Sequence, residues 1–124
     1  MKEIMAVIRM PKMNTTKKAL TDAGVDAFFA YEAQGRGKGL VNTALVEGAA
    51  QGYEEAAVLL GEKGRLYPKR VISVVVEDGD VDEVVETIIK CNQTGAPGDG
   101  KIFVLPVSDA VRVRTAETGA KAIA

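Results

Sequence analysis

The chain has 124 residues, of which 47% are hydrophobic, and its 16 lysines and arginines nearly balance its 17 aspartates and glutamates. This length fits one compact domain, since folded domains typically contain about 50 to 250 residues. The balanced charge lacks the basic excess that drives binding to phosphate backbones, so we expect no nucleic-acid partner. The absence of histidine excludes Ser-His-Asp catalysis, phosphohistidine chemistry and histidine metal ligands.

The compartment is predicted from the cysteine content and from the apolar runs. Cys91 is the only cysteine in the sequence, which excludes an intramolecular disulfide and fits a reducing compartment. The apolar run at the N-terminus is too short for a signal peptide, and Arg9 and Lys12 prevent its extension. No run approaches the roughly 20 apolar residues of a transmembrane helix. We therefore expect a cytoplasmic protein without membrane insertion.

The first third of the chain predicts strand, helix and strand. Residues Glu3–Arg9 are apolar and β-branched enough for a buried strand, which Pro11 is expected to stop. A helix is then expected to run from Asn14, as its N-cap, to a stop at Gly24. Residues Val25–Gln34 return to aromatic and small apolar side chains, which indicates a second strand that ends at the following glycine.

The tract from Gly35 to Pro68 has no single periodic pattern. Its glycines interrupt every longer repeat, although "YEEAAVLL" could form a short helix. Loops longer than about 15 residues are usually functional or disordered. We interpret this tract as a mobile binding loop, with an ordinary helical insertion as the alternative.

The remaining chain predicts a second strand-helix-strand unit. Residues Lys69–Asp78 indicate a strand, and a helix comes next with Asp80 as its cap. The apolar face of that helix is expected to contain Val81, Val84, Val85, Ile88 and Ile89. "IFVLPV", at 102–107, and "AVRVRT", at 110–115, are predicted to be two short strands, and the last ten residues are predicted to be a flexible tail.

This order of elements favours an α+β fold of the ferredoxin-like βαββαβ type. One antiparallel sheet with two helices on one face buries both amphipathic helices against four strands. The opposite face of the sheet still needs cover, because strands such as "VISVVV" are apolar on both faces. An exposed apolar face of this size predicts oligomerisation.

A glycine-rich tract with nearby cations is the main functional signal. Backbone without Cβ atoms can curl so that N–H groups converge on phosphate or carboxylate oxygens. Lys101 follows this tract, and Arg112 and Arg114 would project from one face of a predicted strand. The glycines concerned are Gly95, Gly98 and Gly100. Together they suggest a polyphosphate ligand, whereas the alternative is a plain helix-to-strand connection with solvated charges.

Two features limit what these glycines can mean. The tract is not a Walker motif, because Ile102 comes after the lysine and a strand begins where that motif needs a hydroxyl and a helix. "GRGKG", Gly35–Gly39, is a second cluster of glycines and cations at the start of the long loop. By itself it also fits a flexible hinge with two solvated cations.

Taken together, these tracts resemble the PII signal-transduction proteins of nitrogen metabolism over nearly the whole chain. "TGAPGDGKIFVLPV", at 94–107, resembles that family's phosphate-binding loop and its next strand, and "VRVRT", at 111–115, resembles the arginine segment that opens its C-terminal loop. "GRGKG" resembles the base of its T-loop. The resemblance implies a ferredoxin-like trimer whose single domain, 1–124, contains a T-loop at about 35–68, a phosphate-binding loop at about 93–101 and a C-terminal loop at about 112–124.

The resemblance also implies two ligands, held in clefts between neighbouring subunits. ATP or ADP would be bound by Gly35, Gly37, Lys38, Val75, Gly98, Asp99, Gly100, Lys101, Arg112 and Arg114, with Val75 in the adenine pocket. 2-Oxoglutarate would bind beside MgATP at the root of the T-loop, at Lys38, Gly39, Lys69 and Gly98, with Lys69 pairing with its distal carboxylate. Mg²⁺ is a further candidate cofactor, and no residue is assigned as a metal ligand.

Departures from the family pattern point to a subgroup. Gly39 stands where the family normally has a glutamine that helps to bind metal and metabolite, and "NTALVEG" replaces the nucleotidylated tyrosine motif in a longer loop. The "GRGKG" start and the extended loop resemble the NifI group, whose members are encoded with nitrogenase, act on dinitrogenase and assemble as two unlike partners. The longer loop resembles the longer of the two types. The resemblance therefore implies a homotrimer, or a mixed assembly with a second PII-like subunit, and a nitrogenase component as partner.

The function that this resemblance implies is regulation without catalysis. The ligands would bias the T-loop toward one conformation, and the loop would report carbon and nitrogen status to its target. One alternative is a PII regulator of an ammonium channel or of another nitrogen-assimilation target. Another is a small ATP-using enzyme, for which Asp99 or Asp109 would be the only acids near the loop.

Overall fold

The computed structural model describes residues 1–37 and 66–124. Most of the predicted T-loop, including Lys38 and Gly39, lies outside the described residues. The elements of the first range are β1 (Lys2–Ile8), the 3-10 helix η1 (Met10–Lys12), α1 (Met13–Asp22) and β2 (Phe29–Gly35). Those of the second range are β3 (Tyr67–Val76), the 3-10 helix η3 (Asp78–Asp80), α4 (Val81–Asn92), β4 (Lys101–Pro106) and α5 (Ala120–Ile123).

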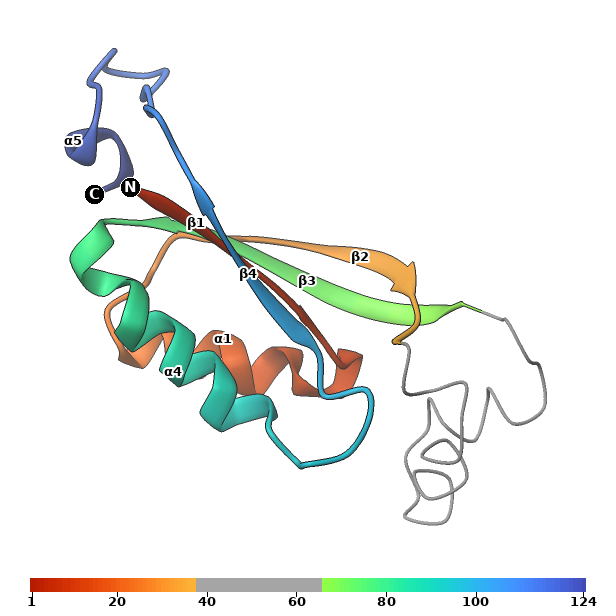
Figure 1. The fold of residues 1–124 in the computed structure, drawn as a ribbon. Coiled ribbons are helices and arrows are strands. Elements are labelled where there is room, and N and C mark those ends of the chain that lie inside the picture. Colours follow the sequence, from red (N-terminus) through yellow and green to blue (C-terminus); the bar gives the residue numbers. More distant parts are fainter. Residues whose placement is uncertain (38–65) are drawn as a thin grey trace.

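The four strands form one antiparallel sheet in the order β2-β3-β1-β4. Helices α1 and α4 lie side by side on one face of this sheet (Figure 1). This arrangement confirms the predicted ferredoxin-like βαββαβ fold. Among the described residues no helix is long and apolar enough to cross a membrane.

The core lies between the sheet and the two helices. Alternate residues of the two central strands point toward the helices, because successive side chains of a strand project to opposite faces. The fully or almost fully buried members of this core are Ile4, Ala6, Ile8, Leu20, Ile72, Val74, Val84 and Ile88. Each large aliphatic side chain buried here contributes roughly 1.5 to 3 kcal/mol relative to exposure, so this layer is the main source of stability.

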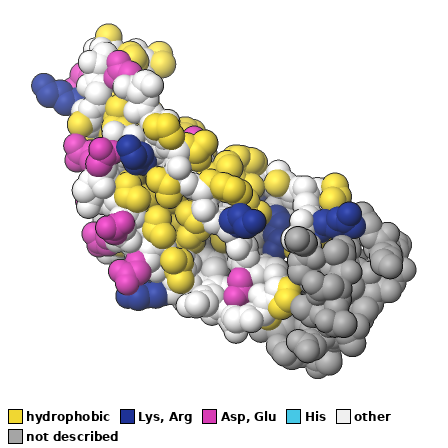
Figure 2. Space-filling model, viewed as in Figure 1, with side chains coloured by type: hydrophobic (Ala, Val, Ile, Leu, Met, Phe, Trp, Pro, Cys, Tyr) yellow, Lys and Arg dark blue, Asp and Glu magenta, His cyan; other side chains and the backbone are white. Residues whose placement is uncertain are grey.

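The opposite face of the sheet exposes aromatic and aliphatic side chains. Phe29 is 73% exposed, Tyr31 48% and Phe103 44%. Phe29 and Phe103 lie in one row across the sheet, since Phe29 pairs with Ser73, Ser73 with Met5, and Met5 with Phe103. Figure 2 shows hydrophobic side chains gathered along the middle of the molecule, where β4 lies in Figure 1. Exposed apolar faces of this kind usually pack against another subunit, which supports the predicted oligomerisation.

Two predicted element boundaries need correction. The prediction of Asn14 as N-cap is wrong, because η1 and α1 already begin at Met10 and Met13. Pro11, which was expected only to end the strand, fits this first helical turn, where its fixed φ and missing N–H are tolerated. The second strand begins at Phe29 rather than at Val25. The predicted stop at Gly24 is confirmed, with a φ of 90° after the end of α1.

Helix α4 matches its prediction except at two residues. Val84 and Ile88 are buried in the core, and Val81 and Val85 pack against it. Ile89 is 40% exposed, because it lies about 100° around the helix from Ile88 and so turns away from the sheet. Asp80 precedes α4 as predicted, but its side chain makes no capping hydrogen bond.

The C-terminal segment, residues 107–124, differs most from its prediction. Residues 110–115 form no strand, and Val111 makes one isolated bridge, to Thr118. The backbone N–H of Arg112 donates to the carbonyl of Glu117 at 2.8 Å, and the N–H of Gly119 donates to the carbonyl of Ala110 at 3.0 Å. Local turns therefore satisfy backbone groups that a strand would have paired with a neighbour. The predicted flexible tail contains these turns and the short helix α5 instead.

Candidate functional site

The glycine-rich loop between α4 and β4 is folded around the carboxylate of Asp99. The backbone N–H groups of Thr94 and Gly95 donate to Oδ2 of Asp99, at 2.7 and 2.9 Å, and the Thr94 hydroxyl donates to Oδ1. Nη1 of the buried Arg9 donates to the same carboxylate at 2.6 Å, and Nη2 donates to the carbonyl of Pro97 at 3.0 Å. Asp99 therefore shapes the loop from within.

These hydrogen bonds keep Asp99 ionised. Burial alone raises the pKa of Asp99, but hydrogen bonds from Thr94, Arg9 and Gly95 outweigh it and lower the pKa from 3.8 to about 2. Hydrogen bonds to a carboxylate favour its charged form. A side chain with these contacts positions the loop, and the direct ligand contact that the family resemblance implies for Asp99 stays a prediction.

Gly100 closes the loop onto strand β1. Its φ is 117°, and a Cβ added there would lie 2.0 Å from the carbonyl oxygen of Val7. Only glycine allows both this backbone conformation and this approach. Gly98 also has a positive φ, of 97°. The glycines of the motif are thus required by the path of the chain, and they bring backbone groups next to Lys101 at the start of β4.

Lys69 connects strand β3 to the same loop. Its side chain is buried, and Nζ donates to the carbonyl of Gly98 at 2.7 Å. The ammonium also lies 4.8 Å from the centre of the Tyr67 ring, a distance at which a cation is attracted to the face of an aromatic ring. A buried cation is therefore held at the edge of the glycine-rich loop.

A hollow of about 370 Å³, the loop hollow, joins the glycine-rich loop to the end of β2. Six residues predicted to bind ligand line it: Gly35, Gly37, Lys69, Gly98, Gly100 and Lys101. Arg36 adds a third cation, and no aspartate or glutamate is among the lining residues that the structure describes. Three cations beside backbone donors suit an anionic ligand such as phosphate or carboxylate.

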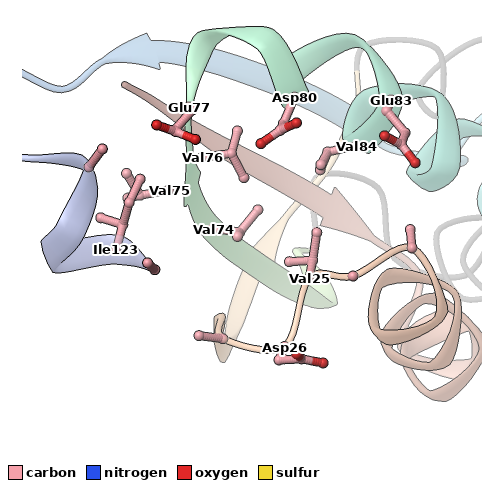
Figure 3. Close-up of a pocket in the computed structure, with 15 residues that line it drawn as sticks. Val25, Asp26, Val74, Val75, Val76, Glu77, Asp80, Glu83, Val84 and Ile123 are labelled. Atoms are coloured by element: carbon pink, nitrogen blue, oxygen red, sulfur yellow. The ribbon is translucent and has the colours of Figure 1, made fainter.

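Val75 lies away from the loop hollow. It lines a different hollow of about 390 Å³, the valine hollow, together with Val25, Val74 and residues of α5. In Figure 3, Ile123 of α5 lies on the same side of this hollow as Val75, and Glu77, Asp80 and Glu83 lie along its other edge. The apolar lining would suit a flat ring, but within one subunit it is separate from the loop hollow.

The two predicted arginines are not paired on one face. The prediction that Arg112 and Arg114 project together from a strand is wrong, because no strand forms there. Nη1 of Arg112 donates to the carboxylate of Glu117 at 3.2 Å, and Nη2 donates to the backbone oxygens of Lys121 and Ala124 at 3.0 and 2.7 Å. Arg114 is exposed.

Sequence reasoning missed three contributors to the site. Arg9 was expected only to limit an apolar run, although a charged residue at the end of a buried strand is a signal for a buried ion pair. Arg36 belongs to "GRGKG", so its motif was noticed without its role in the hollow. Tyr67 precedes the predicted strand and gave no signal of its contact with Lys69. Lys38 and Gly39, also predicted to bind ligand, lie outside the described residues.

Comparisons with known proteins agree on one family. The profile of the family described as "Nitrogen regulatory protein P-II" matches residues 1–117. The chain is 48% identical to "Nitrogen fixation nifHD region GlnB-like protein 2" of Methanobacterium ivanovii, over 99% of each chain. It is 44% identical to "Nitrogen regulatory protein P-II 2" of Methanothermobacter thermautotrophicus, over 99% of this chain and 97% of that one.

A solved structure shows the same fold. The crystal structure of Arabidopsis thaliana PII bound to citrate superposes with a TM-score of 0.73 at 30% sequence identity. The match covers 98% of this chain and 88% of the plant chain. The similarity therefore extends beyond the glycine-rich loop to the whole architecture.

Proposed function

This chain belongs to the nitrogen regulatory protein P-II family, and on that premise we propose that it binds ATP or ADP and 2-oxoglutarate between subunits and thereby controls nitrogenase. P-II proteins are regulatory signalling proteins rather than enzymes, which removes the alternative of a small ATP-using enzyme. The observation that carries the proposal is the loop hollow, where Lys69, Lys101 and the glycine-rich loop meet.

The loop hollow supports phosphate binding. Lys101 is exposed at its rim, so its ammonium can reach a phosphate without losing an internal partner among those that the structure describes. The positive φ angles of Gly98 and Gly100 let backbone donors approach a ligand closely. Asp99 and Arg9 hold this shape before the ligand arrives, which lowers the entropy cost of binding.

A neighbouring subunit would complete the nucleotide site. Val75 follows Lys69 by six positions on β3, a separation of about 20 Å at about 3.3 Å per residue. A nucleotide with its phosphates at Lys101 would therefore meet the Val75, Arg112 and Arg114 of the next subunit. The exposed apolar face of the sheet gives a reason for such subunits to associate, as a homotrimer or with a second PII-like chain.

The proposed second ligand is a dicarboxylate. Lys69 already holds the carbonyl of Gly98, so a carboxylate arriving there would meet a desolvated, positioned cation. The plant relative is bound to citrate, which is also a carboxylate ligand. Lys38 and Gly39 would complete this site from the segment that the structure does not describe, with Mg²⁺ as a further candidate beside the nucleotide.

Nitrogenase is the proposed target. The relatives that carry the words "nitrogen fixation nifHD region" in their names support a role in nitrogen fixation. The predicted T-loop begins at Gly35, inside the loop hollow, so a ligand there can favour one loop conformation over another. Such coupling is limited to the difference in ligand affinity between the two conformations, typically about 1 to 3 kcal/mol.

Calorimetric titration tests this function. 2-Oxoglutarate is titrated into the protein in the presence and in the absence of MgATP, and we expect binding only with the nucleotide. Equal binding without nucleotide would contradict a shared site. A pull-down from nitrogen-fixing cells that recovered an ammonium channel in place of a nitrogenase component would reject the proposed target and leave the ligands untouched.

A further inference from the structure

The C-terminal segment is folded back on one of the residues proposed to bind nucleotide. The guanidinium of Arg112 donates three hydrogen bonds to its own chain, at the Glu117 carboxylate and at the backbone oxygens of Lys121 and Ala124. Glu117 is itself held in place, because the Thr115 hydroxyl donates to its Oε1 at 2.7 Å. The guanidinium therefore has an anion and two carbonyl groups where a phosphate would bind.

The same segment also reaches the valine hollow. Ala120, Ile123 and Ala124 line that hollow together with Val75, the residue proposed to meet the adenine ring. Figure 3 shows α5 at the edge of the hollow, with the Ile123 side chain near Val75. An aliphatic side chain thus lies beside the proposed adenine pocket, while a carboxylate from the same segment occupies Arg112.

The geometry points to an internal competitor. We propose that residues 117–124 act as a latch, in which Glu117 takes the place of a phosphate on Arg112 and Ile123 takes the place of the base beside Val75. Nucleotide must displace this latch to bind, so the latch lowers nucleotide affinity and releases the C-terminal segment when ATP arrives. This inference rests on the proposed nucleotide site and adds a mode of regulation to it.

Other contacts within the segment would break when the latch opens. The backbone N–H groups of Arg112 and Gly119 make their hydrogen bonds only while 110–112 and 117–119 lie together, and Ala116 has a φ of 60°. A non-glycine residue in this left-handed region is costly, so the turn gains conformational freedom when the latch opens. Arg112 and Glu117 are only partly buried, which keeps the contact weak enough to be displaced.

Nucleotide titrations of the full chain test the latch. Glu117→Gln removes the anion and keeps the shape of the side chain, and a chain that ends at Gly119 removes α5. We expect ATP to bind Glu117→Gln about twofold to fivefold more tightly than wild type, the range that a partly exposed ion pair supplies. The matched control is Glu86→Gln, which changes the net charge equally on the exposed face of α4 and should leave the affinity unchanged.

A double-mutant cycle separates the latch from a general charge effect. In an Arg112→Ala background, Glu117→Gln should no longer change the affinity for ATP, because the pair is already broken. Hydrogen exchange gives an independent readout, since the amides of Gly119 and Ala122 should exchange faster when ATP is added. Greater protection of these amides with ATP would mean that the segment closes over the nucleotide, and it would overturn the latch.

The outcomes distinguish the latch from the site on which it rests. If wild type binds ATP and neither Glu117→Gln nor the shortened chain binds it more tightly, the latch is wrong and the proposed function stands. If the shortened chain binds ATP more tightly than wild type, the latch is supported. If neither protein binds ATP, both proposals fall.

Discussion

Two regions of this chain contain cations proposed to meet phosphate, and they are organised in opposite ways. In the glycine-rich loop, internal contacts of Arg9 and Asp99 fix the backbone and leave Lys101 exposed. In the C-terminal segment, Arg112 itself makes the internal contacts. The first region is thus prepared for an anion, whereas the second must give up contacts to receive one. Single substitutions in each region can test either side of this difference.

The largest effect is expected from Gly100→Ala. The new methyl group would lie 2.0 Å from the Val7 carbonyl oxygen at a φ of 117°, so either the loop or β1 must move. We expect the free energy of unfolding to fall by about 3 to 5 kcal/mol, measured by urea denaturation. The control is Gly95→Ala in the same loop, where φ is 86° and an added Cβ would have no atom within 4 Å beyond its chain neighbours. Its cost should be about 1 kcal/mol. Equal costs would show that the close approach to Val7 is unimportant.

A smaller loss is expected from Asp99→Asn. The variant removes a carboxylate that accepts hydrogen bonds from Thr94, Gly95 and Arg9, and the free energy of unfolding at pH 7 should fall by about 2 kcal/mol. The exposed Asp26 offers a control, since Asp26→Asn should change stability by less than about 0.5 kcal/mol. An Asp99→Asn protein as stable as wild type would contradict the role of this carboxylate.

The pH dependence of stability depends on the same group. The pKa of Asp99 is lowered in the fold from 3.8 to about 2, so its ionised form stabilises the protein above pH 3.8 and the contribution disappears as the pH falls through about 2. The difference in unfolding free energy between wild type and Asp99→Asn should therefore shrink between about pH 5 and 2. This difference is measured by chemical denaturation at each pH. If it stays constant over this window, the stability lost in Asp99→Asn comes from the change in side-chain shape and not from the loss of charge.

Lys101→Ala should affect binding more than folding. Lys101 is exposed, so unfolding should change little, while loss of a charge-assisted hydrogen bond to phosphate should weaken ATP binding about tenfold. Lys90→Ala removes the same charge from the exposed face of α4 and should leave the affinity for ATP unchanged. If calorimetry shows that both variants weaken ATP binding equally, the loss comes from the change in net charge and not from a contact between Lys101 and phosphate.

The smallest effect on global stability is expected from Arg112→Ala. Its contacts lie within the C-terminal segment, outside the core, so the unfolding free energy should change by less than about 1 kcal/mol. The amides of Gly119 and Ala122 should nevertheless lose protection in hydrogen exchange, because Arg112 holds the segment together. Unchanged protection would mean that the backbone turns alone maintain this segment.

The sequence allowed the fold to be predicted where a pattern is local and strong. β1, β3 and α4 match their apolar periodicity, and four strands with two helices leave few ways to bury both helices. The start of α1 was misplaced because Asn14 is a good cap in isolation, whereas Pro11 lets the helical turns begin earlier. Alternation in "VRVRT" predicted a strand, but local hydrogen bonds between Arg112 and Glu117 compete with one.

The residues of the candidate site could be predicted from the sequence, but the contacts between them could not. The motif singled out Gly98, Gly100 and Lys101, and the structure places them around one hollow with Lys69. The internal role of Asp99 depends on Arg9, which lies 90 positions away, and no local pattern contains such a contact. The hydrogen bonds of Arg112 likewise depend on how the last residues fold back onto it, which the composition does not specify.

A crystal structure grown with MgATP tests the central claim most directly. We predict an oligomer in which the phosphates lie against the backbone amides of the glycine-rich loop, with Lys101 of one subunit and Arg112 of its neighbour within hydrogen-bond distance. An intact oligomer with that loop empty at saturating nucleotide, or with the triphosphate bound elsewhere, would contradict the account.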